Sequence, residues 1–338
     1  MAASAGAGRF GGGRAGEGFN GGGLERLPVF TLGGGGRQAR QGCATRLLAE
    51  LAQRGVGGVF VPGGGEASHH HLAQLSARYD LVLVDGGDGP EGAIVARGWA
   101  GDDLLPPLPL PPGQEGWAGW VTALFEALGR GMERTPLWAC VLIGGKSSRM
   151  GRPKHLLDAR GGRTWLERTV TVLRPLVDGL VLSGGGILPP ALQETPRLLD
   201  LPGVSGPLAG IVAAMRWQPL VSWLVVACDM PRLSAAAVQW LLADRRPGCW
   251  GLVPRAEGDG RLEPLCAWYD FRAAQLFEEL VHSGMWRLSA AASHRRIAHP
   301  PIPAHHALAW ANVNTPEELA RLAGALAEDQ PASPREAP

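Results

Sequence analysis

A glycine turn followed by clustered basic residues is the part of the sequence best suited to chemistry on phosphates. Residues 139–143 form a short apolar run that predicts a buried parallel strand, and Gly144 and Gly145 end it. Glycines at such a turn let backbone amides face an anion without side chains in the way. Four positive charges then follow within nine residues: Lys146, Arg149, Arg152 and Lys154. The segment predicts a loop that binds the phosphates of a nucleotide.

Asp229 is the acidic residue best placed to complement this loop. It follows the apolar run at 223–228, which also reads as a buried strand. In a parallel α/β sheet, ligands gather at the carboxyl ends of the strands, so we expect Asp229 and the glycine turn to share one edge. A carboxylate there suits Mg²⁺, which binds through one or two carboxylates while keeping substrate oxygens. Two plainer readings compete: Asp229 caps the next helix, and the basic residues form a solvated surface.

Alternating strand-like and helix-like segments place these residues in the second half of the chain, 137–326. Thr164 and Glu167 have the spacing of a capping box, and Leu166, Val170 and Leu173 recur on one helical face. Further strands are predicted at 180–183, 223–229 and 251–254, with helices starting near Pro207 and Ser234. This order predicts an α/β fold with a Rossmann-like, doubly wound, mostly parallel sheet and right-handed crossovers.

A smaller α/β unit is expected at 27–130. It combines an apolar start at 27–32, a helix-like stretch at 45–55, an apolar strand at 80–87 and a helix-like stretch at 116–130, with a proline segment at 104–112. Residues 1–26 are rich in glycine and residues 327–338 in small and polar types, so both ends are expected to be flexible tails.

Composition narrows the classes of protein. With 338 residues the chain has room for two domains, and a net charge of +1 argues against a nucleic-acid binder that works through bulk electrostatics. Five scattered cysteines without a CxxC pair indicate neither a disulfide framework nor a zinc site. No apolar run approaches the roughly 20 residues that span a bilayer. The expectation is a cytoplasmic protein without a membrane partner.

Five motifs together resemble one family. The segment GGKSSRMGRPK from Gly144 resembles the nucleotidyltransferase signature, and GPLAG, CDMPRL, EPLCAWY and NVNTPEEL follow it in order, beginning at Gly206, Cys228, Glu263 and Asn312. Their order and spacing are similar to those of the molybdenum cofactor guanylyltransferases, the MobA family, over about Leu137 to Gly324. The resemblance implies Mg²⁺-dependent transfer of GMP from GTP to the terminal phosphate of molybdopterin, with release of pyrophosphate.

The resemblance also implies roles for individual residues. Those that would hold the nucleotide are Leu142, Ile143, Gly144, Gly145, Lys154, Asp200 and Asp229. Those that would act in catalysis are Arg149, Lys154 and Asp229, with Asp229 as the metal ligand. Asn312 and Asn314 would contact the pterin cofactor or the nucleotide, and Glu263 is a further acidic candidate. The segment after Asn314 also has a structural explanation, because Thr315, Pro316 and Glu318 match a helix cap.

The chemistry of phosphate transfer explains why two basic residues and a metal ligand would suffice for catalysis. An attacking phosphate and a polyphosphate repel one another, so catalysis depends chiefly on positioning and on neutralising charge. Lys154 and Arg149 would stabilise the transferred group and the leaving pyrophosphate. The substrate supplies its own phosphate oxygen as nucleophile, so no covalent intermediate with the protein is expected.

The sequence departs from the guanylyl pattern at one position. Pro153 stands before Lys154 where the family usually has aspartate, and the related molybdopterin cytidylyltransferases often have proline there. Gly145, Met230 and the paired asparagines resemble the guanylyl branch instead. Cytidylyl transfer, nucleotidyl transfer to another small phosphate, and a non-catalytic scaffold that delivers the cofactor to molybdoenzyme apoproteins remain the alternatives.

The first unit resembles a degenerate member of the MobB family of small P-loop GTP-binding proteins. A working P-loop requires GxxxxGK followed by Ser or Thr, so that the lysine reaches the outer phosphates. Here the region reads GGGGRQARQGCAT, with Cys43 where the lysine should stand. Little or no nucleotide hydrolysis is expected from this unit. The histidines at 69–71 are expected to form an exposed polar turn rather than a metal site.

Overall fold

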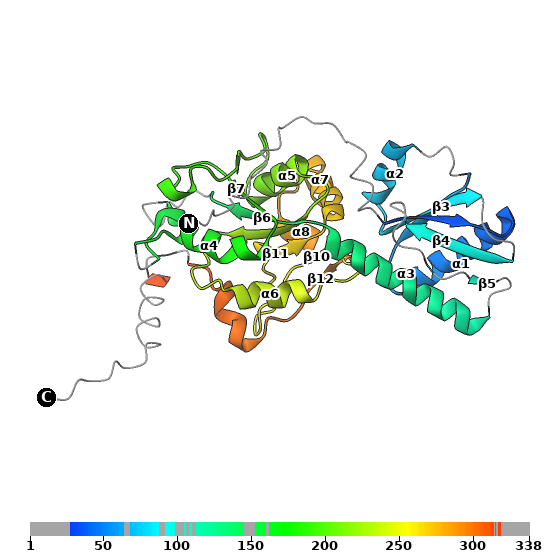
Figure 1. The fold of residues 1–338 in the computed structure, drawn as a ribbon. Coiled ribbons are helices and arrows are strands. Elements are labelled where there is room, and N and C mark those ends of the chain that lie inside the picture. Colours follow the sequence, from blue (N-terminus) through cyan, green and yellow to red (C-terminus); the bar gives the residue numbers. More distant parts are fainter. Residues whose placement is uncertain are drawn as a thin grey trace, which may run out of the picture.

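The computed structural model describes residues 28–63, 68–87, 92–98, 105, 108–109, 113–144, 153–159, 162–313, 315 and 317–318. Figure 1 shows two α/β units side by side, the first coloured blue to cyan and the second green to orange. Predictions for the two tails, for most of the proline segment and for Gly145, Arg149 and Asn314 concern residues outside these ranges.

The second unit contains a seven-stranded sheet in the order β12-β10-β11-β9-β6-β7-β8. Its strands are β6 (Leu137–Leu142), β7 (Gly179–Ser183), β8 (Arg197–Leu198), β9 (Ser222–Ala227), β10 (Gly251–Leu252), β11 (Cys266–Tyr269) and β12 (Ile297–Ala298). Strand β11 runs antiparallel to β9 and β10, and the other pairs are parallel. This confirms the predicted mostly parallel sheet.

Helices cover both faces of that sheet (Figure 1). On one face α4 (Trp165–Leu173) and α6 (Ala235–Ala243) pack against Ala139 and Val141 of β6. On the other, α5 (Pro207–Trp217), α7 (Ala274–His282) and α8 (Leu288–Ala292) pack around Cys140 and Val225. Alternate residues of the central strands therefore enter two separate cores, as expected of a buried parallel sheet.

The predicted helix starts are confirmed. Thr164 and Glu167 form a complete capping box at α4, with the Thr164 hydroxyl accepting from the Glu167 amide at 3.2 Å. The Ser234 hydroxyl accepts from the Ala237 amide and caps α6. Pro207 is the first residue of α5, after Gly206 in the left-handed region at φ 75°.

The first unit contains a five-stranded sheet in the order β2-β3-β1-β4-β5. Its elements are β1 (Val29–Gly33), α1 (Arg37–Gln53), β2 (Gly58–Val61), α2 (His69–Ser76), β3 (Leu81–Gly87), β4 (Ala93–Gly98), β5 (Leu108–Pro109) and α3 (Gln114–Arg134). Strands β2, β3 and β1 are parallel, and β4 and β5 add antiparallel pairs at one side. A smaller α/β unit therefore precedes the larger one, as predicted.

The histidines at 69–71 do not form a turn, so that expectation was wrong. They make up the first turn of α2, where the hydroxyl of Ser68 accepts from the His71 amide at 3.2 Å. A serine cap at the right position was sufficient to start a helix there.

Arg40 lies at the glycine turn that follows β1 in the first unit. Its Nε donates to Asp85 Oδ1 at 2.6 Å, and Nη1 donates to the carbonyl oxygens of Gly34 and Gly35 at 3.2 and 2.8 Å. Arg40 and Asp85 are both buried. A phosphate-binding loop presents amide hydrogens to its ligand, whereas this loop presents carbonyl oxygens to a cation. The chain's own guanidinium thus fills the turn. Little or no nucleotide hydrolysis by this unit stays a prediction.

The Asp85 carboxylate depends on that guanidinium. Burial alone would raise the pKa of Asp85, but the hydrogen bond and charge of Arg40, with backbone amides of Gly87 and Gly63, hold the pKa below its usual value. Its ionised form therefore adds stability above the ordinary aspartate pKa, and this contribution is lost as the pH falls through the lowered one.

The first unit docks on the amino ends of the parallel strands of the second. Helix α3 ends at Arg134, two residues before β6 begins. Val82 and Val84 of the first unit pack in one apolar cluster with Phe271 and Leu220 of the second. Leu220 precedes β9, so this contact lies at the end of the sheet opposite to the carboxyl ends of β6 and β9.

Asp80 is the polar centre of this interface and is 2% exposed. Its carboxylate accepts from Trp250 Nε1 at 2.6 Å, from Arg296 Nη1 at 2.6 Å and from Arg272 Nη1 at 3.2 Å, all in the second unit. The amide of Gly57, in the first unit, also donates to it at 2.7 Å. A buried carboxylate with this many donors is fully compensated only while the units stay docked.

Arg40→Met should destabilise the first unit by about 3 kcal/mol at pH 7, because it leaves the buried Asp85 carboxylate without its cation. Burial would then raise the pKa of Asp85, so the loss should be smaller at pH 4 than at pH 7. Urea unfolding at the two pH values measures both effects. The double variant Arg40→Met with Asp85→Asn should recover most of the stability, and an equal loss at both pH values would contradict the ion-pair explanation.

Asp80→Asn should lower the free energy of unfolding by about 3 kcal/mol, because two buried guanidiniums lose their shared charge. Asp244→Asn is the matched control: Asp244 pairs with Arg246 at 3.1 Å, but both side chains are about half exposed. Its loss should stay below about 1 kcal/mol. Equal losses in the two variants, measured by urea unfolding, would show that Asp80 does not join the units.

Candidate active site

Three strands of the second unit end at the same level, and this defines the edge where the site lies. In the parallel register, Leu142 at the end of β6 is paired with Ser183 at the end of β7 and with Ala227 at the end of β9. The segments that follow these strands therefore start side by side. They carry the glycine turn, a second glycine loop at 184–186 and Asp229.

Leu142 and Ile143 can contribute to the site only through their backbone atoms, because both side chains are buried in the cores. The Ile143 amide donates to the carbonyl oxygen of Ser183 at 2.8 Å, and the Cys228 amide donates to that of Leu142 at 3.3 Å. Gly144 is exposed, and no atom of the described residues would come within 4 Å of a side chain placed there.

Lys154 and Asp229, 75 residues apart in sequence, are in direct contact. The Lys154 ammonium lies 3.0 Å from Asp229 Oδ2, and the two side chains are 18% and 21% exposed. They are accessible enough to meet a ligand and buried enough for the charge interaction to be strong. The structure therefore brings together the predicted phosphate-binding lysine and the predicted metal ligand.

A short 3₁₀ turn at Lys154–Leu156 positions the lysine. His155 is buried, and its Nε2 lies 2.9 Å from the carbonyl oxygen of Ile187, in the loop after β7. Leu157 packs with Trp165 of α4 and with Val313. These contacts hold the backbone that follows the lysine, and His155 is a positioning residue that the motif search did not single out.

The alternative role of Asp229 as a helix cap is wrong, because Ser234 caps the following helix. Asp229 instead contacts the last motif through its backbone: its carbonyl oxygen accepts from the Val313 amide at 3.0 Å. This places Asn312 beside Asp229. The Asn312 Oδ1 atom is buried and has no hydrogen-bond partner among the described residues.

The predicted helix cap after Asn314 is also present, since Thr315 and Glu318 bond reciprocally at 3.2 and 3.3 Å.

The structure places Glu263 within electrostatic range of Asp229. It is 5% exposed, and its Oε1 lies 2.8 Å from Arg261 Nη2. Burial raises the pKa of Glu263, the charge of Arg261 opposes this, and the carboxylate of Asp229 adds to the rise. The sequence analysis named Glu263 as a further acidic candidate, and its proximity to Asp229 follows from the pairing of β11 with β9.

Asp200 lies farther away. It follows the edge strand β8, which is separated from β9 by β7 and β6, and its side chain is exposed. A site that includes Asp200 must therefore extend across the sheet edge, over the glycine loop at 184–186. Gly184 in that loop has φ 122°, and a side chain there would lie 2.9 Å from the carbonyl oxygen of Ile143. The loop packs too closely for any residue but glycine.

A protein nucleophile at this edge is not supported by the cysteines. Burial raises the pKa of the Cys228 thiol to about 12, and the neighbouring Asp229 carboxylate adds to the rise. The thiol stays protonated at neutral pH and is a poor nucleophile. This agrees with the expectation that no covalent intermediate forms.

The donor set fits magnesium better than a transition metal. The described residues contain no group of three or more His, Cys, Asp or Glu side chains that could hold a metal ion. One accessible carboxylate at Asp229, with Glu263 in its electrostatic range, suits an ion that takes its remaining ligands from substrate phosphates and water.

A mostly parallel sheet with a glycine turn, a lysine and an aspartate at its carboxyl edge defines a nucleotide-binding α/β protein of the nucleotidyltransferase class. Residues 139–298 match the family described as MobA-like NTP transferase domain. The molybdenum cofactor guanylyltransferase of Rhizobium meliloti is 36% identical over 196 residues, which cover 54% of this chain and 88% of that protein. The chain therefore belongs to the MobA-like family of molybdenum cofactor guanylyltransferases, as the motifs predicted.

Two other similarities differ in extent. The molybdenum cofactor biosynthesis bifunctional protein of Synechocystis sp. is 31% identical over 168 residues, and the chain spans about half of its length, 48%. The crystal structure of molybdopterin-guanine dinucleotide biosynthesis protein A from Archaeoglobus fulgidus is 24% identical, with a TM-score of 0.48, and covers 56% of this chain and 99% of that chain.

None of the helices within the described ranges is long and apolar enough to cross a membrane.

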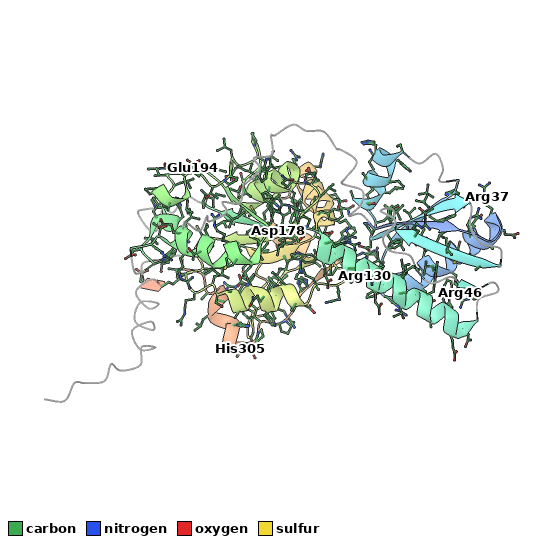
Figure 2. All side chains as sticks on the ribbon, viewed as in Figure 1. Arg37, Arg46, Arg130, Asp178, Glu194 and His305 are labelled. Carbon is green, nitrogen blue, oxygen red and sulfur yellow. The ribbon has the colours of Figure 1, made fainter. Side chains whose placement is uncertain are left out.

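Lys154→Met should weaken GTP binding about ten- to a hundredfold, because a charge-assisted contact with phosphate contributes roughly 1.5–3 kcal/mol. Calorimetric titration of the full chain with GTP and Mg²⁺ measures this. Glu194→Gln is the control, since this exposed glutamate, labelled in Figure 2, lies in the segment before β8 and outside the lysine–aspartate pair. Unchanged affinity in Lys154→Met would remove the lysine from the phosphate site.

Proposed function

We propose that this protein is a molybdenum cofactor guanylyltransferase that transfers GMP from GTP to the terminal phosphate of molybdopterin. The products are pyrophosphate and the molybdopterin guanine dinucleotide cofactor. The observation that supports this best is the contact of Lys154 with Asp229 at the carboxyl edge of a sheet that matches the MobA-like family. The named relatives give the reaction its substrates.

Lys154 has two partners in the proposed cycle. Without nucleotide its ammonium neutralises the Asp229 carboxylate, which keeps a half-buried charge compensated. With GTP bound, the ammonium turns to the phosphates and stabilises the charge that develops on them and on the leaving pyrophosphate. Arg149, from the basic loop, would add a second cation.

Asp229 would hold Mg²⁺ when the lysine has moved to the phosphates. The bound ion supplies neutralisation of phosphate charge and orients the transferred group. Glu263 and the buried Oδ1 of Asn312 lie near Asp229 and would fix the water or substrate groups around it. The molybdopterin phosphate is the nucleophile, so the protein's task is to align two phosphates and offset their repulsion.

The proline before the lysine has a structural explanation that does not involve the base. Pro153 is the N-cap of the turn Lys154–Leu156, with φ −58° and ψ 123°. A proline fixes that φ in advance and so presets the start of the turn that carries Lys154. Its presence therefore need not signal a preference for cytosine nucleotides, although cytidylyl transfer remains the second candidate.

Incubation of the full chain with molybdopterin and Mg²⁺, with either GTP or CTP, tests the proposal. We expect the guanine dinucleotide to form with GTP, at least tenfold faster than the cytosine product forms with CTP, together with one pyrophosphate per turnover. Preferential use of CTP would instead make the protein a cytidylyltransferase. Formation of neither product would favour the scaffold alternative.

Asp229→Asn should reduce the turnover rate at least a hundredfold and abolish its dependence on Mg²⁺ concentration, because the carboxylate proposed to hold the metal is lost. Pyrophosphate release as a function of Mg²⁺ measures this, and Asp178→Asn is a matched control. Asp178, labelled in Figure 2, bonds the Leu137 amide at 2.8 Å at the opposite end of β6. Normal Mg²⁺ dependence in Asp229→Asn would place the metal elsewhere.

The cellular setting follows from the proposed reaction. The product is a cofactor, so molybdoenzyme apoproteins are the partners that would receive it, and the cytoplasm is where GTP and a reducing environment coexist.

A further inference from the structure

A cavity of about 220 Å³ lies between the two units. It is far from the nucleotide edge, the carboxyl edge of the second sheet that carries Lys154 and Asp229. Its walls come from three segments: the residues after α1 (Arg54 and Gly55), the loop at 246–249 and the segment at 295–298. The last two lead into β10 and β12 at their amino ends, so the cavity and the Lys154–Asp229 pair lie at opposite ends of the sheet.

Four arginines and no Asp or Glu are among the described residues that line this cavity: Arg54, Arg246, Arg295 and Arg296. Four cations around one small space repel one another, and in a cavity this electrostatic cost is larger than in open water. Neighbouring surfaces usually intersperse both charges, so a lining of one sign indicates a place where an anion binds.

Arg296 is the fixed member of the set. Its side chain is 10% exposed, and Nη1 bonds Asp80 Oδ2 at 2.6 Å and the carbonyl oxygen of Gly248 at 3.2 Å. It also donates to the carbonyl oxygen of Gly55, across the interface. The aromatic ring of Trp250 lies 5.3 Å from its guanidinium carbon. A guanidinium held from several sides costs little further entropy when a ligand binds.

The acidic groups near the cavity only weakly offset the positive charge of the other arginines. Glu50 lies 3.9 Å from Arg54, and Asp244 lies 3.1 Å from Arg246. The arginines of both pairs are 44% and 53% exposed, and such pairs are weak in water. They can give way to a dianion that meets several guanidiniums together. The carboxylate of Asp80 is buried behind Arg296 and is already bonded to Arg272 and Trp250.

We propose that this cavity binds a phosphate group, either inorganic phosphate or the terminal phosphate of a nucleotide. Guanidinium forks match phosphate oxygens in pairs, and each of the three wall segments carries at least one arginine. Because Arg54 belongs to the first unit and Arg246, Arg295 and Arg296 to the second, the ligand bridges the units and stabilises their docking. The inference goes beyond the proposed transferase reaction and does not depend on it.

Titration of the full chain with inorganic phosphate at constant ionic strength tests the site. We expect saturable binding by calorimetry in the wild type and at least a tenfold loss of affinity in the double variant Arg54→Gln with Arg295→Gln. Both side chains are exposed, so the variant should fold normally, which urea unfolding without phosphate verifies. The matched control is Arg78→Gln with Arg174→Gln, which removes two exposed arginines outside the cavity.

Two results would overturn the proposal: no saturable phosphate binding by the wild type, or equal affinities in the cavity variant and the control variant. Competition by GMP identifies the source of the group. Displacement of phosphate by GMP at similar concentrations supports a nucleotide ligand, and failure of GMP to compete supports free phosphate. Titrating phosphate into the variant Asp229→Asn excludes the nucleotide edge as its site, because binding in the cavity should be unchanged there.

Discussion

The in-register pairing of β6 with β7 and β9 is the constraint on which the rest of the structure depends. It brings Leu142, Ser183 and Ala227 to one level, so the segments that leave the three strands must share a small volume. Residues that follow different strands can then meet, as Lys154 and Asp229 do at 3.0 Å. A shift of one residue in either pairing would turn Asp229 away and exchange the side chains that enter the two cores. The two apolar cores fix this register, and so packing and chemistry are specified by the same hydrogen bonds.

Buried charges are used differently in the two units. In the first, Arg40 and Asp85 close a glycine loop that elsewhere would receive phosphate, and the bond pattern of Gly34 and Gly35 is inverted to match a cation. In the second, the lysine–aspartate pair is partly open, so its partners can change. Exposure decides the difference: a pair that is about 7% exposed serves the fold, and a pair that is about 20% exposed can serve a ligand. Between them, Asp80 of the first unit joins the second unit through ion pairs with Arg272 and Arg296.

Local signals in the sequence were strong enough to predict the elements and the edge. Thr164 with Glu167, Ser234, and Pro207 after Gly206 are cap patterns whose physics involves only neighbouring residues, and all three mark helix starts. Contacts between distant residues were not accessible in this way. Nothing local to Asp80 shows that it meets Arg296, 216 residues later, and nothing near Cys43 shows that Arg40 closes the loop. Both contacts arise from strand order and docking, which a single chain specifies only through its complete fold. The histidines at 69–71 show the converse, where one serine cap outweighed an apparent turn.

The position of the first unit limits what it can do for the reaction. It contacts the second sheet at the start of β9, β10 and β12, whereas the nucleotide edge lies where β6, β7 and β9 end. The described residues of the first unit that make this contact are separated from that edge by the full length of the strands. The first unit can still affect the stability of the second through the docking contacts. Without the first unit, Arg272 and Arg296 lose their ion pairs with Asp80. A fragment that begins at Leu137 therefore lacks the stabilising interface as well as the first unit. Any weaker nucleotide binding by such a fragment has to be separated from its lower stability before the first unit is assigned a role in recognition.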